Sequence, residues 1–190
     1  SFFVVLYHMI TEKKKIKKSN FCVGVHKYLV SKMQKYNLSS YFIPIGTPIS
    51  NFEKHLGSDK KSGDKRDDKY IVYVGFINYR LNFDWIEYLA IQLPSIRIKM
   101  VGPTNEKIKY HLSQFPNIHF TGTKTGDELY NIISNSLVCI APYVTNKNTK
   151  KVLTMPNKFL LYLSFGKPIV TCHIPNLELN TKFAYQSLNA

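Results

Sequence analysis

The 190-residue sequence has few cysteines and no long apolar run, and both absences limit what kind of protein it can be. The three cysteines, Cys22, Cys139 and Cys172, are far apart and odd in number. They favour buried thiols in a reducing compartment over a disulfide framework or a zinc site. No apolar run approaches the roughly 20 residues that span a bilayer. The apolar start at residues 1–10 lacks the features of a signal peptide, and because it does not begin with Met we expect a fragment.

Acidic residues are also scarce, with 12 Asp and Glu against 26 Lys and Arg, which gives a formal net charge of +14. Such an excess is typical of proteins that meet nucleic acid, anionic lipid or phosphorylated substrates. The lysines are spread widely, however, so the charge alone identifies no partner. The basic run at residues 12–18 is read as a solvated face, with contact to anionic lipid as the alternative. No nucleic-acid-binding motif is present, so we expect no nucleic-acid partner.

The motifs of common nucleotide-binding and metal-dependent enzymes are missing. There is no GxGxxG, no P-loop, no HExxH and no DxD in a strand context, since Asp67 and Asp68 lie in a charged stretch. The sequence therefore supports neither a Rossmann dehydrogenase nor a metal-dependent transferase. It predicts no metal site and no cofactor.

What the chain does have is a regular alternation of strand-like and helix-like segments from Tyr70 onward. This alternation predicts right-handed βαβ units around a parallel sheet. The predicted fold class is α/β, a Rossmann-like parallel sheet flanked by helices. In the first of the helices we expect Trp85, Tyr88, Leu89 and Leu93 to face inward. The strands are predicted at 70–74, 96–101, 118–120, 137–141 and 169–172, and the helices at 84–93, 106–114, 127–135 and 156–165.

A charged stretch divides the chain into two parts. Residues 53–69, EKHLGSDKKSGDKRDDK, have almost no apolar side chains, so they cannot bury enough surface to offset their ordering entropy. We predict three segments: residues 1–52, a charged linker at 53–69, and a Rossmann-like domain at 70–190. In the first segment we expect a strand at 21–25, a helix at 26–36 and a strand at 41–46, while residues 1–10 fit either a strand or a helix.

The position of a ligand follows from the fold class. In an open α/β sheet the ligand binds beyond the C-terminal ends of the strands, which selects the loops after Val74, Val101, Phe120 and Ala141. Pro156 is placed to start a helix, whose free backbone N–H groups and dipole attract an anion such as phosphate. Lys158 lies in that first turn, where a cation works against the dipole unless an anion lies between them.

The stretch at residues 155–170, MPNKFLLYLSFGKPIV, resembles the pattern P-x-K-x-x-E-Y-L-A-x-G-K-P-V-V. That pattern belongs to the C-terminal, donor-binding half of GT-B glycosyltransferases, in the bacterial family 4-like and glucuronosyltransferase-like group. The glutamate of the pattern, which holds the ribose hydroxyls of the nucleotide, is Leu161 here. The resemblance covers residues 70–178 well and 20–52 loosely. The matching positions are Pro156, Lys158, Tyr162, Leu163, Gly166, Lys167 and Pro168.

This resemblance implies a metal-independent glycosyltransferase of polysaccharide biosynthesis. The donor would be a nucleotide-diphosphate sugar, expected to be UDP-linked, and the acceptor a glycan or a lipid-linked molecule. Residues 1–52 would be the remnant of the N-terminal acceptor domain, which also supplies the catalytic base in this fold, so the catalytic residues are unknown. The expected location is cytoplasmic, with the inner face of the membrane as a possible peripheral site. The sugar, the linkage and the oligomeric state cannot be read from the sequence.

The resemblance also implies a set of donor-binding residues. Lys158 would neutralise the departing diphosphate, and Arg80 would clamp it. Thr123 and Lys124 would lie near the nucleobase. Three of these residues also have a purely structural interpretation, which stays open: Gly75 as a turn glycine, Arg80 as a surface arginine and Tyr143 as an aromatic residue at the rim. The expected donor-binding set is Gly75, Asn78, Arg80, Tyr143, Met155, Pro156, Asn157 and Lys158.

Two other functions remain open. The Leu161 replacement removes an expected ribose anchor, and a hydroxyl pair left without its acceptor costs about 1–3 kcal/mol. The chain could therefore be a non-catalytic nucleotide-sugar-binding or partner subunit of the GT-B type. A basic nucleic-acid-binding module is the least supported reading, because the aromatic residues fall at core spacing.

Overall fold

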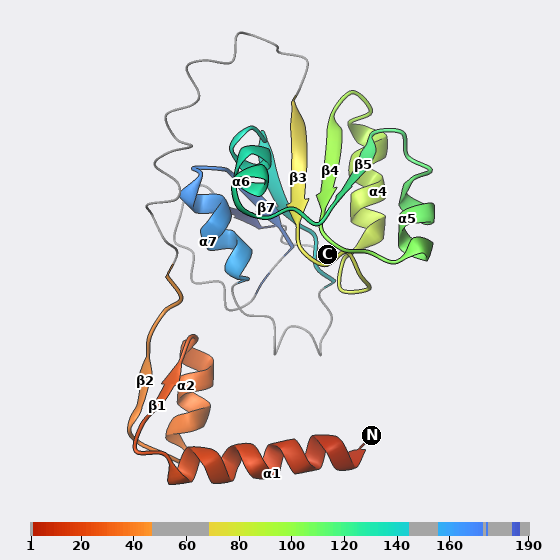
Figure 1. Ribbon diagram of the computed structural model, residues 1–190. Coiled ribbons are helices and arrows are strands. Elements are labelled where there is room, and N and C mark those ends of the chain that lie inside the picture. Colours follow the sequence, from red (N-terminus) through yellow and green to blue (C-terminus); the bar gives the residue numbers. More distant parts are fainter. Residues whose placement is uncertain (1, 47–68, 145–155, 173, 175–183, 187–190) are drawn as a thin grey trace. The chain divides into compact units, whose positions relative to one another are not determined.

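The computed structural model describes residues 2–46, 69–144, 156–172, 174 and 184–186 (Figure 1). The chain divides into two compact units, Ser1–Gly46 and Thr47–Ala190. Each unit has its own parallel sheet, one with two strands and one with six. Within the described residues, no helix is both long and apolar enough to cross a bilayer.

The first unit consists of helix α1 (Phe2–Lys18), strand β1 (Cys22–Gly24), helix α2 (Lys27–Gln34) and strand β2 (Ser40–Phe42). The strand, helix and strand predicted between residues 21 and 46 are therefore confirmed. The start of the chain, which periodicity left undecided, is helical, and α1 includes the basic run at residues 12–18. The His26 side chain caps α2 by accepting a hydrogen bond from the Tyr28 backbone N–H at 3.2 Å.

The two-stranded sheet of this unit is apolar on a face that stays exposed. Strands β1 and β2 are parallel, and α2 packs on them with Val30 buried. Val23 and Tyr41 are paired in register, so they share one face, and they are 43% and 57% exposed. Parallel sheets normally have both faces covered. The same alternation continues in the neighbouring exposed residues Phe21, Val25 and Ile43.

The second unit is a six-stranded parallel sheet with the order β5-β4-β3-β6-β7-β8. This architecture confirms the predicted α/β, Rossmann-like fold. Strand β8 was not predicted, and β5 continues to Gly122, two residues beyond the predicted end. The strands are β3 (Tyr70–Val74), β4 (Arg97–Val101), β5 (Ile118–Gly122), β6 (Val138–Ala141), β7 (Ile169–Thr171) and β8 (Ala184–Gln186). The helices are α4 (Phe83–Gln92), α5 (Glu106–Leu112), α6 (Gly126–Ser134) and α7 (Asn157–Ser164).

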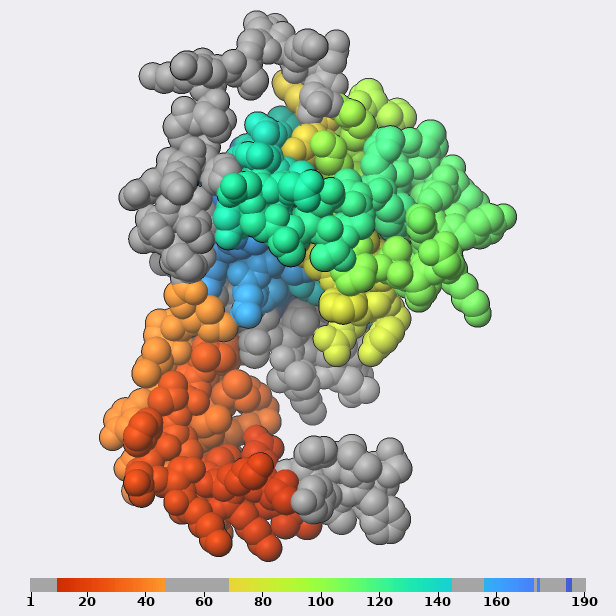
Figure 2. All heavy atoms as spheres, viewed as in Figure 1, coloured from red at the N-terminus to blue at the C-terminus, as the bar shows by residue number. Residues whose placement is uncertain are grey.

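Helices cover both faces of this sheet, and the sequence of β3 shows why. Tyr70 and Val72 belong to a core cluster that includes residues of α6 and α7, whereas Ile71 and Tyr73 belong to one that includes residues of α4 and α5. Successive side chains of a strand point to opposite faces, so a continuous apolar run is buried on both sides. Figure 2 shows α6 (teal) and α7 (blue) side by side on one face.

Helix α4 corrects one prediction about the core. Its buried residues are Ile86 and Ala90, while Tyr88 is 61% exposed and Leu93 is 38% exposed. Trp85 and Leu89, which were also expected to face inward, are half-buried against the core. The face that meets the sheet is centred on Ile86 and Ala90, which are four residues apart on one side of the helix. The Asn82 side chain caps the start of α4 by accepting a hydrogen bond from the Trp85 N–H at 3.1 Å.

The strand order creates a split between β3 and β6. The chain runs from β3 to β4 and β5 on one side, then crosses to β6 and β7 on the other. Such a reversal is the topological switch point at which α/β sheets bind ligands. The pairing of β3 with β6 ends at Val72 and Cys139, so the two strands separate before Val74. We refer to the C-terminal ends of the strands as the carboxyl edge and to their N-terminal ends as the amino edge.

Candidate functional site

Two glycines bring backbone segments into direct contact at the carboxyl edge. Gly75 follows β3 with φ 137°, and Gly102 follows β4 with φ 139°. A Cβ atom on Gly102 would lie 2.1 Å from the Gly75 carbonyl oxygen. The Gly75 N–H donates a hydrogen bond to the Val101 carbonyl at 2.8 Å. Only glycine fits both this backbone conformation and this approach, so the edge beside the switch point is bare backbone.

Helix α7 points its N-terminus at the same edge. Pro156 is its N-cap in an extended conformation and supplies no side-chain hydrogen bond to the helix, and no acidic residue lies in the first turn. The Phe159 N–H bonds to the Pro156 carbonyl at 2.9 Å. The preceding N–H groups, of Asn157 and Lys158, have no acceptor within the helix. This helix start therefore carries a partial positive charge that no acidic residue of its first turn offsets.

Lys158 reaches from α7 to the end of β3. A Cβ atom on Gly75 would lie 2.6 Å from the Lys158 Nζ. The same Nζ lies 4.0 Å from the centroid of the Tyr73 ring and 5.3 Å from that of the Tyr143 ring. Both distances fall within the range of cation–π attraction. Among the described residues no carboxylate pairs with this ammonium, so a lysine with two aromatic neighbours and no counter-ion lies beside Gly75.

The pKa values around Lys158 follow from its burial. Burial lowers the pKa of Lys158 from 10.5 to about 7. Burial raises the pKa of Tyr143 to about 12, against the opposing effect of the Arg80 charge, and it also raises the pKa of Tyr73. Both phenols therefore stay neutral near pH 7 and do not serve as counter-ions. An anion that enters here would favour the protonated form of Lys158.

The loop after β3 is joined to the loop after β6. Leu81 and Tyr143 form an antiparallel bridge, and the Val144 N–H donates to the Arg80 carbonyl at 2.8 Å. The Asn82 N–H donates to the Pro142 carbonyl at 2.7 Å. These bonds hold the Tyr143 ring close to Lys158. They also fix the backbone from which the Arg80 side chain projects.

Asn78 and Arg80 have different roles in this loop. The Asn78 Oδ1 accepts a hydrogen bond from the Arg80 N–H at 3.0 Å, so this side chain shapes the turn. Such side-chain to backbone bonds are typical of asparagine in turns. The Arg80 side chain is exposed, which leaves its guanidinium at the rim of the site.

The structure thus brings several of the sequence-predicted residues together. Gly75, Tyr143 and Lys158 are in mutual reach, and Pro156 and Asn157 form the adjoining helix start. Met155 lies outside the described residues. Lys124 forms an ion pair with Glu128 at 3.2 Å. In the described part of the chain no contact joins Thr123 or Lys124 to Lys158.

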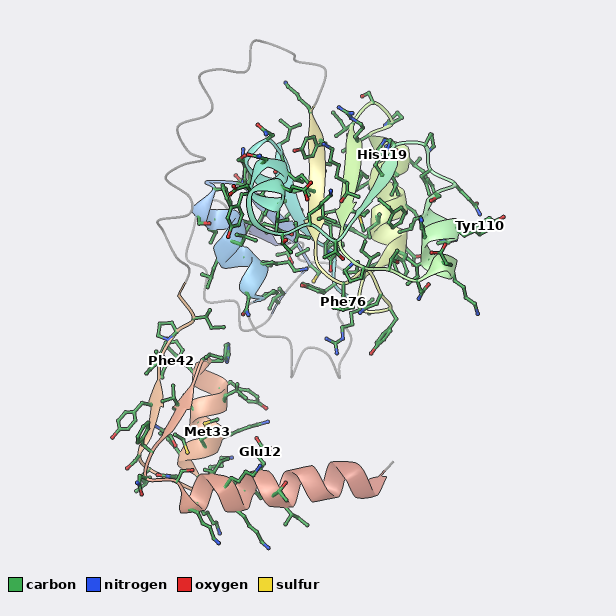
Figure 3. The ribbon with its side chains drawn as sticks, viewed as in Figure 1. Glu12, Met33, Phe42, Phe76, Tyr110 and His119 are labelled. Atoms are coloured by element: carbon green, nitrogen blue, oxygen red, sulfur yellow. The ribbon has the colours of Figure 1, made fainter. Side chains whose placement is uncertain are left out.

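Two tyrosines at this site were not assigned a role from the sequence. Tyr73 is buried, its ring lies under the Lys158 ammonium, and its hydroxyl donates to the Phe76 carbonyl at 2.9 Å. Tyr162 accepts a hydrogen bond from the Val74 N–H at 2.9 Å. Figure 3 labels Phe76 on this loop, with a side chain that is 69% exposed. For Tyr73 the available signal in the sequence was its position two residues before Gly75, the glycine that follows β3. A tyrosine at that position is equally consistent with an ordinary core residue.

Leu161 is part of the apolar packing. Its side chain is half-buried against the core cluster that includes Phe159 and Tyr162. Leu161 stands at the glutamate position of the GT-B pattern, and in this chain that position contributes to the core of the second unit.

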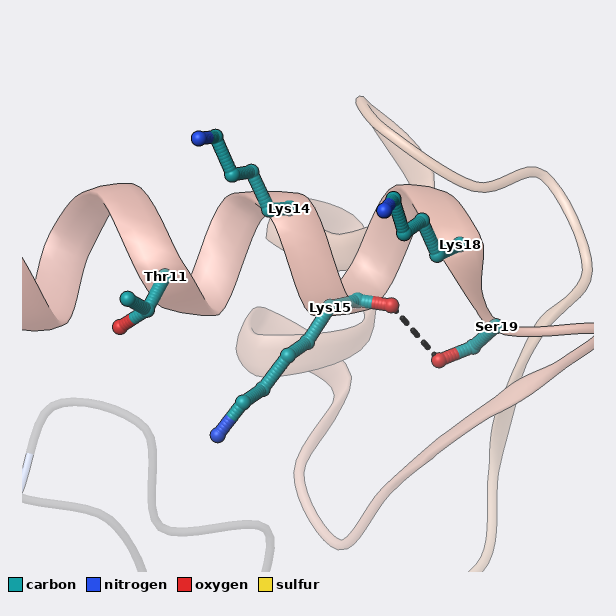
Figure 4. Close-up of a pocket in the computed structure, with 5 residues that line it drawn as sticks. All are labelled: Thr11, Lys14, Lys15, Lys18 and Ser19. Carbon is teal, nitrogen blue, oxygen red and sulfur yellow. Dashed lines mark hydrogen bonds between the residues drawn. The ribbon is translucent and has the colours of Figure 1, made fainter.

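A hollow lies in the first unit, along α1. It has a volume of about 410 Å³ and is lined by Thr11, Lys14, Lys15, Lys18 and Ser19. The Ser19 hydroxyl donates to the Lys15 carbonyl at 2.7 Å. Figure 4 shows that Lys14 and Lys15 extend in opposite directions, so the ammonium groups do not converge on one anion. Among the described residues, His, Cys, Asp and Glu form no group of three that could hold a metal.

Comparison with known proteins begins with the family models. Residues 68–182 match the model described as "Glycosyl transferases group 1". The matched segment contains the six-stranded sheet up to β7 and therefore the whole carboxyl-edge site.

One curated relative is a candidate teichuronic acid biosynthesis glycosyltransferase, TuaH, of Bacillus subtilis (strain 168). The two sequences are 28% identical over 125 residues, which is 64% of this chain and 31% of the relative. The chain therefore matches about a third of the length of that protein.

Several solved structures share the fold. Sucrose-phosphate synthase from Thermosynechococcus elongatus has a TM-score of 0.68 at 13% identity, covering 93% of this chain and 47% of its own. Anabaena HepE in complex with UDP has a TM-score of 0.59 at 10% identity, covering 91% and 51%. The catalytic domain of starch synthase IV from Arabidopsis thaliana, bound to ADP and acarbose, has a TM-score of 0.57 at 11% identity, covering 93% and 47%. At these identities the likeness shows the fold, and the chain spans about half of each structure.

Proposed function

The chain belongs to the family of group 1 glycosyl transferases, and from this premise we propose that its second unit binds the nucleotide-diphosphate sugar donor of a GT-B glycosyltransferase. The donor site is the carboxyl edge between β3 and β6. The observation that carries the proposal is the Lys158 ammonium, which lies beside Gly75 with no carboxylate partner among the described residues.

A diphosphate matches this arrangement in charge and in shape. The helix start at Pro156 presents free N–H groups, and Lys158 adds a full charge in the same turn. Gly75 has no side chain, so phosphate oxygens can approach its backbone closely. Arg80 at the rim supplies a second cation, whose planar guanidinium suits bidentate contact with phosphate. The proposed donor-binding set is completed by Asn78, Tyr143, Met155 and Asn157.

In the proposed reaction the acceptor hydroxyl oxygen bonds to the anomeric carbon of the sugar. The bond from that carbon to the diphosphate oxygen breaks, and the nucleoside diphosphate leaves with the electron pair. The acceptor proton goes to a base outside the donor-binding unit. Lys158 and the helix N-terminus stabilise the negative charge that develops on the leaving group. No metal is needed for this stabilisation.

We propose UDP as the nucleotide, supported by the HepE structure, which contains UDP. A glycan or lipid-linked acceptor in polysaccharide biosynthesis is supported by the name of the Bacillus relative. We assign residues 1–52 to the end of an acceptor-binding domain, 53–69 to a linker, most of which lies outside the described residues, and 70–190 to the donor-binding domain. We further propose a cytoplasmic location, with peripheral contact to an anionic membrane through the exposed lysines of α1.

One observation favours a second candidate function. Leu161 is packed into the core, so it offers no acceptor to the ribose hydroxyls. A nucleotide-sugar-binding subunit without transferase activity would tolerate this loss. The two functions differ in turnover: transfer of sugar from a bound donor to an added acceptor by the complete protein excludes the second.

The test is calorimetric titration of the chain with UDP and then GDP. We expect saturable UDP binding, which Lys158→Ala weakens at least tenfold, or about 1.4 kcal/mol. The matched control is Lys99→Ala, because the Lys99 Nζ also lies over a tyrosine of β3, 3.5 Å from the centroid of the Tyr70 ring. This control should leave UDP affinity within twofold of wild type. Equal affinities of the wild type and Lys158→Ala would refute the proposed site, and a folded chain that binds no nucleoside diphosphate would refute donor binding by this unit alone.

A further inference from the structure

We infer that Tyr162 is a positioning residue, which holds Lys158 over the end of β3 by a hydrogen bond to the backbone of that strand. This inference rests on the proposed donor site. It concerns a residue that touches neither the proposed donor nor the solvent, because Tyr162 is 0% exposed.

The backbone of β3 has a donor without a strand partner at the switch point. The Gly75 N–H bonds to Val101 of β4. Because successive N–H groups of a strand point to opposite sides, the Val74 N–H points toward β6. The pairing with β6 has already ended at Val72, and the Tyr162 hydroxyl accepts the Val74 hydrogen bond at 2.9 Å. A side chain of α7 thus takes the place of a strand carbonyl where the sheet splits.

The Tyr162 hydroxyl accepts this hydrogen bond as a neutral phenol. Burial raises the pKa of the Tyr162 hydroxyl well above its usual value. The phenol is therefore neutral at any pH near 7. Without its oxygen the Val74 N–H would remain unpaired inside the protein, which is unfavourable. The bond adds a directional contact to the apolar packing of α7 against β3.

Helix geometry connects this bond to the candidate site. Tyr162 follows Lys158 by four residues, so both lie on the same face of α7, one turn apart. Val74 is the last residue of β3 and Gly75 follows it, and the Lys158 Nζ lies beside Gly75. The Tyr162–Val74 bond therefore fixes both the rotation of α7 about its axis and its height along β3. These two quantities decide where the Lys158 ammonium lies.

The start of the same strand offers a matched control. Tyr70 is also a buried tyrosine, 3% exposed, and its hydroxyl donates to the Ile132 carbonyl at 2.7 Å. Tyr70→Phe removes one hydroxyl and one tyrosine–backbone hydrogen bond, as Tyr162→Phe does. It does so at the opposite end of β3 from Gly75, through a bond to α6. If Tyr162 had only a structural role, Tyr162→Phe and Tyr70→Phe would have the same effect on UDP affinity.

The experiment compares UDP affinity and thermal midpoint for Tyr162→Phe and Tyr70→Phe. We expect both variants to melt at lower temperature than the wild type. Only Tyr162→Phe should weaken UDP binding, about five- to tenfold. In a Lys158→Ala background the same substitution should have less than a twofold effect, because the group that it positions is absent.

Three results would overturn the inference: wild-type UDP affinity in folded Tyr162→Phe, an equal loss in Tyr70→Phe, or an undiminished loss in the Lys158→Ala background. Should Tyr162→Phe fail to fold, Tyr162→3,5-difluorotyrosine weakens the acceptor and keeps the hydroxyl. We then expect a smaller loss of UDP affinity, and an unchanged affinity would equally overturn the inference. Failure of the folded wild type to bind either UDP or GDP would instead refute donor binding by this unit, on which the inference rests.

Discussion

Each end of strand β3 carries a tyrosine ring under a lysine. At the amino edge the Lys99 Nζ lies 3.5 Å from the centroid of the Tyr70 ring, and near the carboxyl edge the Lys158 Nζ lies 4.0 Å from that of Tyr73. Burial lowers the pKa of both lysines. The pairs differ in what surrounds them, because only Lys158 lies beside a glycine with positive φ and a helix N-terminus.

The backbone explains why the two edges differ. At the amino edge the Tyr70 carbonyl accepts a hydrogen bond from the Leu137 N–H at 2.9 Å, and the Tyr70 hydroxyl bonds to Ile132. At the carboxyl edge the strands separate, and Gly75, Gly102 and Gly122 follow or end them in positive-φ conformations. The same lysine and tyrosine pair thus becomes a candidate binding site only where the backbone leaves room for a ligand.

The largest expected effect concerns the close approach of backbone at the carboxyl edge. Gly102→Ala would place a Cβ atom 2.1 Å from the Gly75 carbonyl oxygen at a φ of 139°. We expect the free energy of unfolding to fall by about 2–6 kcal/mol, from backbone strain of about 1–3 kcal/mol and overpacking of about 1–3 kcal/mol. Urea denaturation monitored by circular dichroism measures this change.

Gly166 provides the amino-edge counterpart. It precedes β7, has φ 62°, and a Cβ atom there would meet nothing within 4 Å. Gly166→Ala should therefore cost only the conformational strain, about 1–2 kcal/mol. Equal losses of unfolding free energy in Gly102→Ala and Gly166→Ala would mean that the Gly75–Gly102 contact is not tightly packed. The two edges would then not differ in backbone packing.

The second prediction is a pH dependence that only the carboxyl-edge lysine should produce. Below pH 7 Lys158 is protonated with or without ligand, so this side chain should add no pH dependence to UDP affinity. Above pH 7 the free protein loses the proton while the complex keeps it, so affinity should fall by up to about tenfold per pH unit. The terminal phosphate of UDP ionises with a pKa of about 6, so the fall assigned to Lys158 is measured above pH 7, where the charge of UDP is constant. Titration calorimetry between pH 6 and about pH 9 measures this profile.

The controls are Lys158→Arg, which stays charged and should flatten the profile, and Lys99→Arg, which should leave it unchanged. The stability of the ligand-free protein should change in the opposite sense. Lys158 binds its proton more weakly in the folded state, so the free energy of unfolding should rise as pH increases from about 7 toward 10.5. A flat affinity profile in the wild type would contradict the role given to Lys158.

The smallest expected effect distinguishes the arginines of the two edges. Arg80 is exposed at the rim of the carboxyl edge, whereas Arg97 begins β4 at the amino edge. Exposed charges contribute about 0.2–1 kcal/mol, so Arg80→Ala should weaken UDP binding about two- to fivefold, and less at high salt. Arg97→Ala should leave UDP affinity unchanged. A loss for both variants would show that net charge, and not position, governs the binding.

Much of the fold could be predicted because the pattern is continuous and local. Strand β3 was predicted at its observed bounds, since five apolar residues ending at Gly75 allow little else. The prediction of the inward stripe of α4 was partly wrong, because the smaller residues Ile86 and Ala90 pack on the sheet and Tyr88 is exposed. Strand β8 was missed, because a three-residue strand depends on its pairing with β7 more than on its own sequence.

The candidate site was predictable to the extent that it follows from strand ends and a helix start. Gly75, Lys158 and Tyr143 come from three separate segments, and their meeting confirms where the loops converge. Tyr73 and Tyr162 could not be separated from ordinary core residues, because both are buried. Their roles depend on single distances across the switch point, which sequence patterns do not contain.

The exposed apolar face of the two-stranded sheet in the first unit has a thermodynamic consequence. Water around Phe21, Val23, Val25, Tyr41 and Ile43 raises the heat capacity of the free surface. Any association that covers this face should therefore show a negative heat-capacity change. It should also weaken on cooling. A preparation kept in the cold would then lose such an association before one kept at ambient temperature.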